Sequence, residues 1–244
     1  MSYSQYYEIM SHDIDKNFCV KPSIIMRYMQ ETANRHMHDA KPSYIDLYNQ
    51  GKNFILSRMN IEIYREIFQY DKVEVVTWPT NKGVSFLRSF QMKRGNELLA
   101  EGGATFALID INTKKFLRCN GEDFANYHEE PALEKIFDCK ARVPDEVELH
   151  LRGERTVSYF DTDLNGHINN TNYPDILANF IPGISNLRII SMSLHFVGEA
   201  KLGSKMSVFT SDKIIENEIV KYYVKSEVNG ETNVVAEMKF VEIK

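Results

Sequence analysis

The sequence has few cysteines and no long apolar run. Its three cysteines, Cys19, Cys119 and Cys139, lie far apart and show no C-x-x-C spacing, which indicates neither a disulfide framework nor a zinc site. No stretch of about 18 apolar residues occurs, and the first residues lack the basic start and apolar segment of a secretory signal. The sequence therefore predicts reduced thiols, no membrane partner and a soluble protein in the cytoplasm.

An excess of basic residues is also lacking. The 29 Lys and Arg residues stand against 34 Asp and Glu residues, for a formal net charge of −5. This balance argues against a general affinity for nucleic acid. With 244 residues, of which 43% are hydrophobic, the chain is long enough to bury a substantial core.

The chain repeats itself. Residues Met59–Val75 align without a gap with Met192–Val208, at an offset of 133 residues. Upstream of these segments, the pattern D-x-D-x-N occurs at Asp13–Asn17 and again at Asp161–Asn165. Both occurrences are followed by a helical pattern, so we predict an internal duplication.

Each half also ends in a hairpin signal. A turn at Gly95-Asn96-Glu97 leads into Leu99–Glu101, and a turn at Asn229-Gly230-Glu231 leads into the similar residues Val235–Glu237. We therefore expect Leu99–Glu101 and Val235–Glu237 to be equivalent. The predicted domains are a first half over residues 1–117, a charged connector over 118–152 and a second half over 153–244. The connector is long enough to cross the outside of the first sheet, but the sequence does not define its path.

Apolar periodicity gives each half one helix followed by strands. Apolar residues at three- and four-residue spacing predict helices over Ser23–His38 and from Tyr173 to Phe180. Runs of β-branched and aromatic residues predict strands at Ile61–Tyr64, Lys72–Trp78, Ser85–Met92, Ala104–Ile111, Ser191–Phe196, Lys205–Thr210, Glu218–Val228 and Asn233–Val241. The expected fold class is α+β, with two curved antiparallel sheets joined edge to edge.

The segment Tyr159–Tyr173 concentrates polar side chains in a turn just before a helix. His167 is suited to acid or base chemistry near neutral pH, and Asp163 and Asn165 are placed to orient it or a water molecule. Free N–H groups at a helix start can stabilise negative charge on a carbonyl oxygen. The alternative is that Asn169 or Asn170 only caps the helix and that the loop is held by its own hydrogen bonds.

The pattern D-x-N-G-H-I-N-N-x-x-Y, from Asp163 to Tyr173, resembles the signature of the acyl-acyl-carrier-protein thioesterases of bacteria and plant plastids. Hotdog thioesterases that act on coenzyme A esters carry a related motif, but the duplication within one chain favours the carrier-protein family. The resemblance implies a tandem, or double, hotdog fold, in which each half is a helix wrapped by a curved antiparallel sheet.

The resemblance also implies the catalytic residues. Asp163, Asn165 and His167 form a polar cluster, and Glu199 completes it. Plant members carry a cysteine after the equivalent glutamate, where this chain has Ala200, so the resemblance favours direct attack by water. Either Glu199 or His167 is the general base; a carboxylate buried in an apolar cleft would suit that role because its pKa is raised. No metal ion or organic cofactor is needed.

Substrate contacts are expected from Asn169, Asn170 and Tyr173, with backbone N–H groups near the two asparagines polarising the thioester carbonyl. The first half has Phe18–Pro22 in place of G-H-x-N-N, so we expect it to be catalytically silent. Its apolar residues either line an acyl tunnel or form ordinary core; the residues in question are Ile25, Met29, Met59, Phe86 and Phe106.

The function implied by the resemblance is hydrolysis of fatty acyl thioesters of acyl carrier protein (ACP) to a free fatty acid and the ACP thiol. Two alternatives stay open. One is an acyl-coenzyme A thioesterase, and the other is a hotdog protein that binds acyl groups without turnover. ACP is the expected partner, and a homodimer of the double unit is also expected as a possibility.

Overall fold

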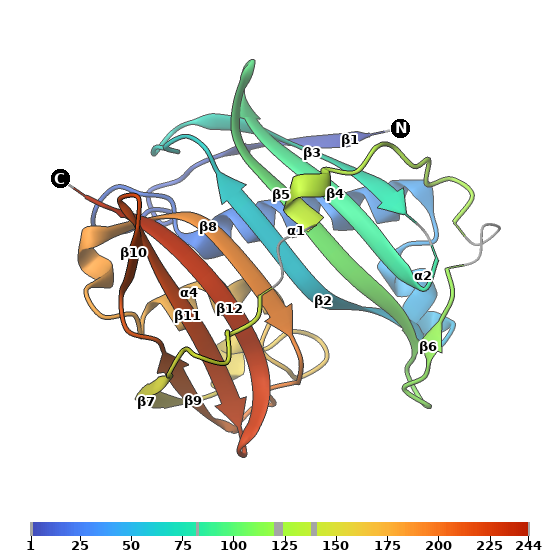
Figure 1. Ribbon diagram of the computed structural model, residues 1–244. Coiled ribbons are helices and arrows are strands. Elements are labelled where there is room, and N and C mark those ends of the chain that lie inside the picture. The colour runs from blue at the N-terminus through green and yellow to red at the C-terminus, as the bar shows by residue number, and fades with distance from the viewer. Residues whose placement is uncertain (1, 82, 120–123, 138–140, 244) are drawn as a thin grey trace.

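A single twelve-stranded antiparallel sheet runs through the molecule (Figure 1). The computed structural model describes residues 2–81, 83–119, 124–137 and 141–243. The strands of the first half are β1 (Tyr3–Glu8), β2 (Lys52–Ile63), β3 (Lys72–Asn81), β4 (Ser85–Arg94), β5 (Glu97–Asp110) and β6 (Phe116–Leu117). Those of the second half are β7 (His150–Thr156), β8 (Leu187–Phe196), β9 (Lys205–Thr210), β10 (Ile214–Glu216), β11 (Ile219–Val228) and β12 (Glu231–Glu242).

The strand order is β1-β3-β4-β5-β2-β8-β12-β11-β9-β7, with β6 on β5 and β10 on β11. The order on one side of the β2–β8 pair mirrors the order on the other, as expected for two equivalent halves joined edge to edge. The helices are α1 (Pro22–Ala40), α2 (Tyr44–Asn49), α3 (Glu134–Phe137) and α4 (Tyr173–Ala178), with short 3-10 turns at Tyr159–Asp161, Asn170–Asn172 and Ile184–Asn186.

The β2–β8 pair confirms the sequence repeat. Asn60 lies opposite Ser193, Met59 opposite Leu194 and Ile61 opposite Met192. An offset of 133 makes Asn60 the equivalent of Ser193, so two equivalent residues face each other. Two copies of one strand pair in this register only when a twofold axis passes between them. The repeat found in the sequence is therefore the symmetry of the fold.

The expected equivalence of Leu99–Glu101 with Val235–Glu237 is wrong by two residues. Ala100 lies opposite Ile63, whereas Val234 lies opposite Phe196, the equivalent of Ile63. Ala100 therefore corresponds to Val234. A shift of two residues keeps every side chain on the same face of a strand, so the apolar pattern did not reveal the error.

The predicted helices and strands are all found; most are longer than predicted, β9 has its predicted bounds, and α4 and β11 are shorter. The helix expected over Ser23–His38 is α1, and its inward residues Ile25 and Met29 are fully buried. β2 and β5 begin several residues before their predicted starts. The sequence did not predict β1, β7 or α2. The edge strand β1 is rich in polar and tyrosine residues, and it has no apolar alternation to detect.

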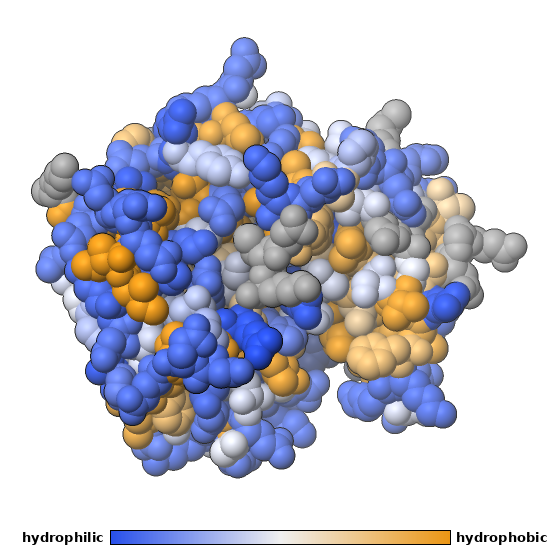
Figure 2. Space-filling model, viewed as in Figure 1, coloured by the Kyte–Doolittle hydropathy of each residue, from blue (hydrophilic) through white to orange (hydrophobic). Residues whose placement is uncertain are grey.

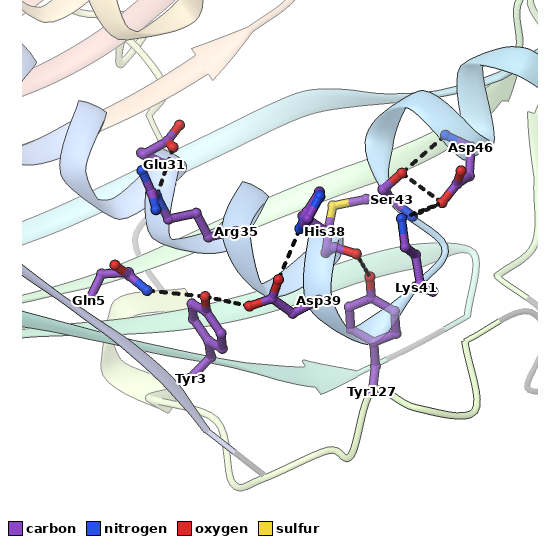
Figure 3. A network of polar contacts seen from close by, with 11 residues as sticks. Tyr3, Gln5, Glu31, Arg35, His38, Asp39, Lys41, Ser43, Asp46 and Tyr127 are labelled. Atoms are coloured by element: carbon purple, nitrogen blue, oxygen red, sulfur yellow. Dashed lines mark hydrogen bonds and ion pairs between the residues drawn. The ribbon is translucent and has the colours of Figure 1, made fainter.

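The first half has a longer helical region than the second. The offset between the halves falls from 148 residues before the helices to 133 after them, so α1 and α2 use 15 more residues than α4 and its flanking turns. A polar network fixes the far end of α1 (Figure 3). In it, the Tyr3 hydroxyl donates to Asp39 at 2.8 Å, and Ser43 and Asp46 form a capping box at the start of α2.

The connector crosses the outer face of the first half's sheet, one of the paths that its length allows. The Asn60 amide donates to the Ile136 carbonyl at 2.7 Å, and the Trp78 indole donates to the Pro131 carbonyl at 2.9 Å. α3 lies over this face, opposite α1 (Figure 1). β7 runs across the expected domain boundary at residue 152.

The face shown in Figure 2 is mostly hydrophilic, and its apolar residues form separate patches over both halves. Across the described part of the chain, no helix combines the length and the hydropathy needed to span a membrane.

Candidate active site

The loop that carries Asp163, Asn165 and His167 is closed by its own hydrogen bonds. The Asp163 N–H donates to the His167 carbonyl at 2.9 Å, and the Asp163 carboxylate accepts from the Asn165 N–H at 2.8 Å. Gly166 completes the turn at φ +72°, a conformation that favours glycine. Leu164 at the tip is 94% exposed. The Asp163 carboxylate therefore shapes the loop rather than contacting His167.

His167 and Glu199 meet where this loop joins the segment after β8. The Ile168 N–H donates to the Ala200 carbonyl at 2.9 Å, which aligns the two segments. His167 Nε2 then lies 3.2 Å from Glu199 Oε2. The His167 side chain is 21% exposed and that of Glu199 is 56% exposed. The apolar burial that the sequence argument assumed for Glu199 is therefore absent.

Asn169 caps the turn that follows. Its side-chain oxygen accepts from the Thr171 N–H at 3.0 Å and from the Thr171 hydroxyl at 2.8 Å, so the capping alternative holds for this residue. The Asn169 N–H donates to the Asp161 carbonyl. Among the described residues, the Asn170 N–H has no hydrogen-bond acceptor. Of the two asparagines, Asn170 is the one whose backbone N–H is available to a ligand.

Tyr173 lies beneath the Glu199 segment. It is 2% exposed, it packs edge-on against Phe196, and burial raises the pKa of its phenol to about 12. Its hydrogen-bond neighbour Asn233 also donates to the Gly198 carbonyl at 2.7 Å. Tyr173 and Asn233 thus support the backbone next to Glu199. The sequence offered no signal for Asn233, because an asparagine near a turn is commonplace.

Two further contacts that the sequence did not reveal hold the site in place. Arg155 on β7 forms an ion pair with Asp161, whose carboxylate also accepts from the Ser158 N–H at 2.8 Å. From the first half, Arg27 on α1 donates to the Asn172 side chain at 2.6 Å. The site therefore lies where the two halves meet.

The first half contains the same loop with other side chains. The Asp15 N–H donates to the Cys19 carbonyl at 2.8 Å, and the Asp15 carboxylate accepts from the Asn17 N–H at 2.8 Å. These bonds match those of Asp163, so Cys19 occupies the position of His167, and Phe18, at φ 60°, occupies that of Gly166. Glu66, the equivalent of Glu199, is paired with Arg188 at 3.2 Å.

Of the suggested tunnel residues, Ile25, Met29 and Met59 lie in the main core, and Phe86 lies in a second, smaller apolar cluster. Ile25, Met29, Met59 and Phe86 are at most 3% exposed, and Phe106 is partly buried. Ordinary core packing accounts for these positions. Within the described ranges, no group of three or more His, Cys, Asp or Glu side chains is arranged to hold a metal ion.

Solved structures share this double hotdog architecture. The acyl-ACP thioesterase of Bacteroides thetaiotaomicron is 22% identical, with a TM-score of 0.83 over 98% of this chain and 97% of that protein's chain. The 12:0-ACP thioesterase of Umbellularia californica is 15% identical, with a TM-score of 0.84 over 99% of this chain and 94% of that one. The predicted α+β double hotdog fold is confirmed.

The sequence match to family models is more specific. Residues 1–127 match the acyl-ACP thioesterase N-terminal domain, and residues 145–242 match the acyl-ACP thioesterase C-terminal domain. The chain belongs to the acyl-ACP thioesterase family. The chloroplastic palmitoyl-acyl carrier protein thioesterase of Arabidopsis thaliana is 22% identical over 225 residues, which are 86% of this chain. The chain spans about half the length of such curated relatives, 55% in this case.

Proposed function

We propose that this protein hydrolyses fatty acyl-ACP thioesters to a free fatty acid and the ACP thiol. The observation that carries the proposal is the contact between His167 Nε2 and Glu199 Oε2 at 3.2 Å. Three residues after His167, the backbone N–H of Asn170 has no acceptor among the described residues. Family membership supports acyl-ACP as the substrate, and palmitoyl-acyl carrier protein is the substrate named for the Arabidopsis relative.

In the proposed reaction, water attacks the thioester carbonyl carbon. The pair formed by His167 and Glu199 accepts one proton from the water as the new C–O bond forms. The Asn170 N–H donates to the oxygen that becomes negatively charged. When the C–S bond breaks, the proton held by the pair passes to the departing sulfur, which leaves as the thiol. Asp163 and Asn165 act by shaping the loop that positions His167.

Either Glu199 or His167 is the general base of the pair, and the substitution Glu199→Gln distinguishes the two assignments. If Glu199 is the base, Glu199→Gln removes proton uptake while it keeps a side chain of the same shape. If His167 is the base, Glu199→Gln retains part of the rate, because the imidazole can still accept the proton from water. The kcat of that variant relative to the unmodified protein therefore separates the two assignments.

The test is thiol release from hexadecanoyl-ACP and hexadecanoyl-coenzyme A, with His167→Ala and Glu199→Ala compared with the unmodified protein. His150→Ala is a matched control, since His150 also faces a carboxylate, Asp212 at 3.5 Å, but lies on β7 outside the site. Faster release from ACP, abolished only by the two site variants, supports the proposal. Faster release from coenzyme A identifies the acyl-coenzyme A alternative, and no release from either ester favours a protein that binds acyl groups without turnover.

The proposed setting is the cytoplasm. Cys19 is a free thiol, which is typical of a reducing compartment. The fused halves already form the pair that a single hotdog unit obtains by dimerisation, and a homodimer of the double unit stays a prediction.

A further inference from the structure

A cavity of about 900 Å³ opens beside the first-half loop, at the position equivalent to the candidate active site. The loop residues Asn17 and Cys19 form one side of it, and α4 with the start of β8 forms the other. Its volume lies within the range of roughly 300–1,000 Å³ that is typical of small-molecule sites. The half that lacks His167 therefore has a substantial cavity of its own.

The inner wall of the cavity is apolar. It is made by side chains that belong to the main core and are at most 8% exposed: Ile63, Ile67, Leu187, Ile189 and Phe240. Such a wall takes up an alkyl chain by removing its surface from water.

Four cations line this cavity, namely Lys16, Lys21, Arg65 and Arg188, and Arg188 is the one that comes from the second half. Lys21 donates to the His12 carbonyl, and Arg65 is paired with Glu97. Arg188 has a side chain that is 25% exposed, and it contacts Glu66 through Nε. Its two terminal nitrogens make no hydrogen bond within the described part of the chain. The equivalent residue in the other half is Ile55, through the offset that relates β2 to β8. Arg188 thus offers a planar cation with two free nitrogens, for which the other half has no counterpart at this position.

The carboxylates in the wall are already engaged. Asp15 accepts from the Asn17 and Cys19 N–H groups, and Asp175 accepts from Ser23. Glu242 is paired with Lys213 at 2.6 Å. Glu66 is the exception, because its side chain is 51% exposed and can turn to solvent when another anion approaches Arg188.

We propose that this cavity is a second, non-hydrolytic site that binds a free fatty acid, with the carboxylate on Arg188 and the chain along the apolar wall. The choice of ligand rests on the proposed function, whose product is a fatty acid. Two terminal guanidinium nitrogens match the two oxygens of a carboxylate. Cys19 in place of His167 leaves the site without the imidazole that hydrolysis in the other half requires.

Cys19 reports on this cavity alone. It lines the wall, whereas Cys119 is 6% exposed. The experiment measures the rate at which methyl methanethiosulfonate modifies Cys19, followed by peptide mass spectrometry, with and without hexadecanoate below its micelle concentration. Because burial raises the pKa of the Cys19 thiol, the labelling is done at alkaline pH. We expect hexadecanoate to slow the labelling in a saturable way.

Substitutions of Arg188 and Glu66 should change the protection by hexadecanoate in opposite directions. Arg188→Met should raise the hexadecanoate concentration that gives half-maximal protection about tenfold, because it removes hydrogen bonding to a charged group. Arg188→Lys should retain part of the protection, and Glu66→Gln should strengthen it by removing the competing anion. Arg152→Met is the matched control, since Arg152 is 28% exposed and paired with Asp212, away from the cavity.

Three outcomes overturn the second site: no protection by hexadecanoate, equal protection by hexadecyltrimethylammonium, or protection unchanged in Arg188→Met. Thiol release from hexadecanoyl-ACP, measured on the same preparations, tests the proposed function separately. Lost protection with normal thiol release contradicts the second site alone. Protection without thiol release contradicts hydrolysis and leaves the second site standing.

Discussion

The loops around Cys19 and His167 share their backbone hydrogen bonds and differ in the side chains that face a ligand. Each is held by an aspartate whose carboxylate accepts from the N–H two residues later and whose own N–H donates to the carbonyl four residues later. One loop carries an imidazole in contact with Glu199, and the other carries a thiol beside a carboxylate already paired with Arg188. The comparison shows that the backbone hydrogen bonds of the loop form whether the loop carries a histidine or a cysteine.

The largest expected effect comes from substituting His167 and its first-half equivalent, Cys19. His167→Ala should lower kcat for thiol release about 100-fold or more, because a positioned acid or base contributes at least that factor. Cys19→His should not restore the rate when it is combined with His167→Ala, since Glu66 is engaged by Arg188. The measurement is thiol release by the single and double variants. Recovery in the double variant would show that the loop alone determines activity.

A second contrast concerns buried charge in the longer helical region of the first half. Arg88 is 1% exposed, lacks a hydrogen-bond partner at one terminal nitrogen, and donates from the other to His36 at 3.0 Å. Burial, followed by the charge of Arg88, lowers the pKa of His36 to about 4. The equivalent of Arg88 in the second half, from the strand pairings, is Tyr222, which carries no charge.

This contrast predicts a pH dependence of stability. The unfolded chain protonates His36 near the ordinary histidine pKa of 6.5, and the folded chain does so only near 4, so stability is full above pH 6.5 and falls as the pH drops toward 4. The loss is on the order of 2–3 kcal/mol. Urea unfolding of the protein and of His36→Gln across this window measures it. The exposed His38 provides the control variant His38→Gln, which keeps the buried contact of His36 with Arg88 and should change the stability less across this window.

A third test concerns the support for Glu199. The equivalent of Asn233 in the first half is Leu99, so Asn233→Leu gives the second half the residue of the silent half. We expect a loss of about 1–3 kcal/mol of stability, because the Gly198 carbonyl loses its side-chain donor. We also expect the fold-decrease in kcat to exceed the fold-change in KM. Ser226→Ala, which removes only the partner of the Asn233 oxygen, should have a smaller effect on both.

The smallest expected effect concerns the turn residue. Gly166→Ala places a side chain at φ +72° and should destabilise the protein by about 1 kcal/mol. Phe18 holds the equivalent position at φ 60°. Phe18→Gly should therefore relieve local strain. In thermal unfolding, Gly166→Ala should lower the melting temperature, whereas Phe18→Gly should raise it or lower it less. Equal losses in both would mean that backbone conformation does not distinguish the loops.

The repeating elements of the fold were predictable because each buries one face. The α1 stripe was predicted from spacing alone, and in the predicted strand that became β4 the alternating residues Phe86, Arg88, Phe90 and Met92 are all buried. The hairpin equivalence failed because a two-residue shift leaves that alternation unchanged. β1 and β7 are edge strands with few inward apolar residues, so periodicity could not locate them.

The candidate site was predictable from one short segment and from the family resemblance. The motif places His167 near Asn170, and the resemblance identified Glu199, which the structure brings to His167. The exposure of Glu199 and the support from Asn233 depend on strands distant in the sequence. The first-half cavity was not foreseen, because Arg188 comes from the opposite half and belongs to no local pattern.

The pairing of β2 with β8 has an evolutionary consequence. In a homodimer with twofold symmetry, one substitution alters both copies of a site at once. Here the twofold relation between Asn60 and Ser193 lies within a single chain, so each copy can change alone. A histidine can become a cysteine at one position while its counterpart is retained, and a lost catalytic site becomes free to acquire another ligand.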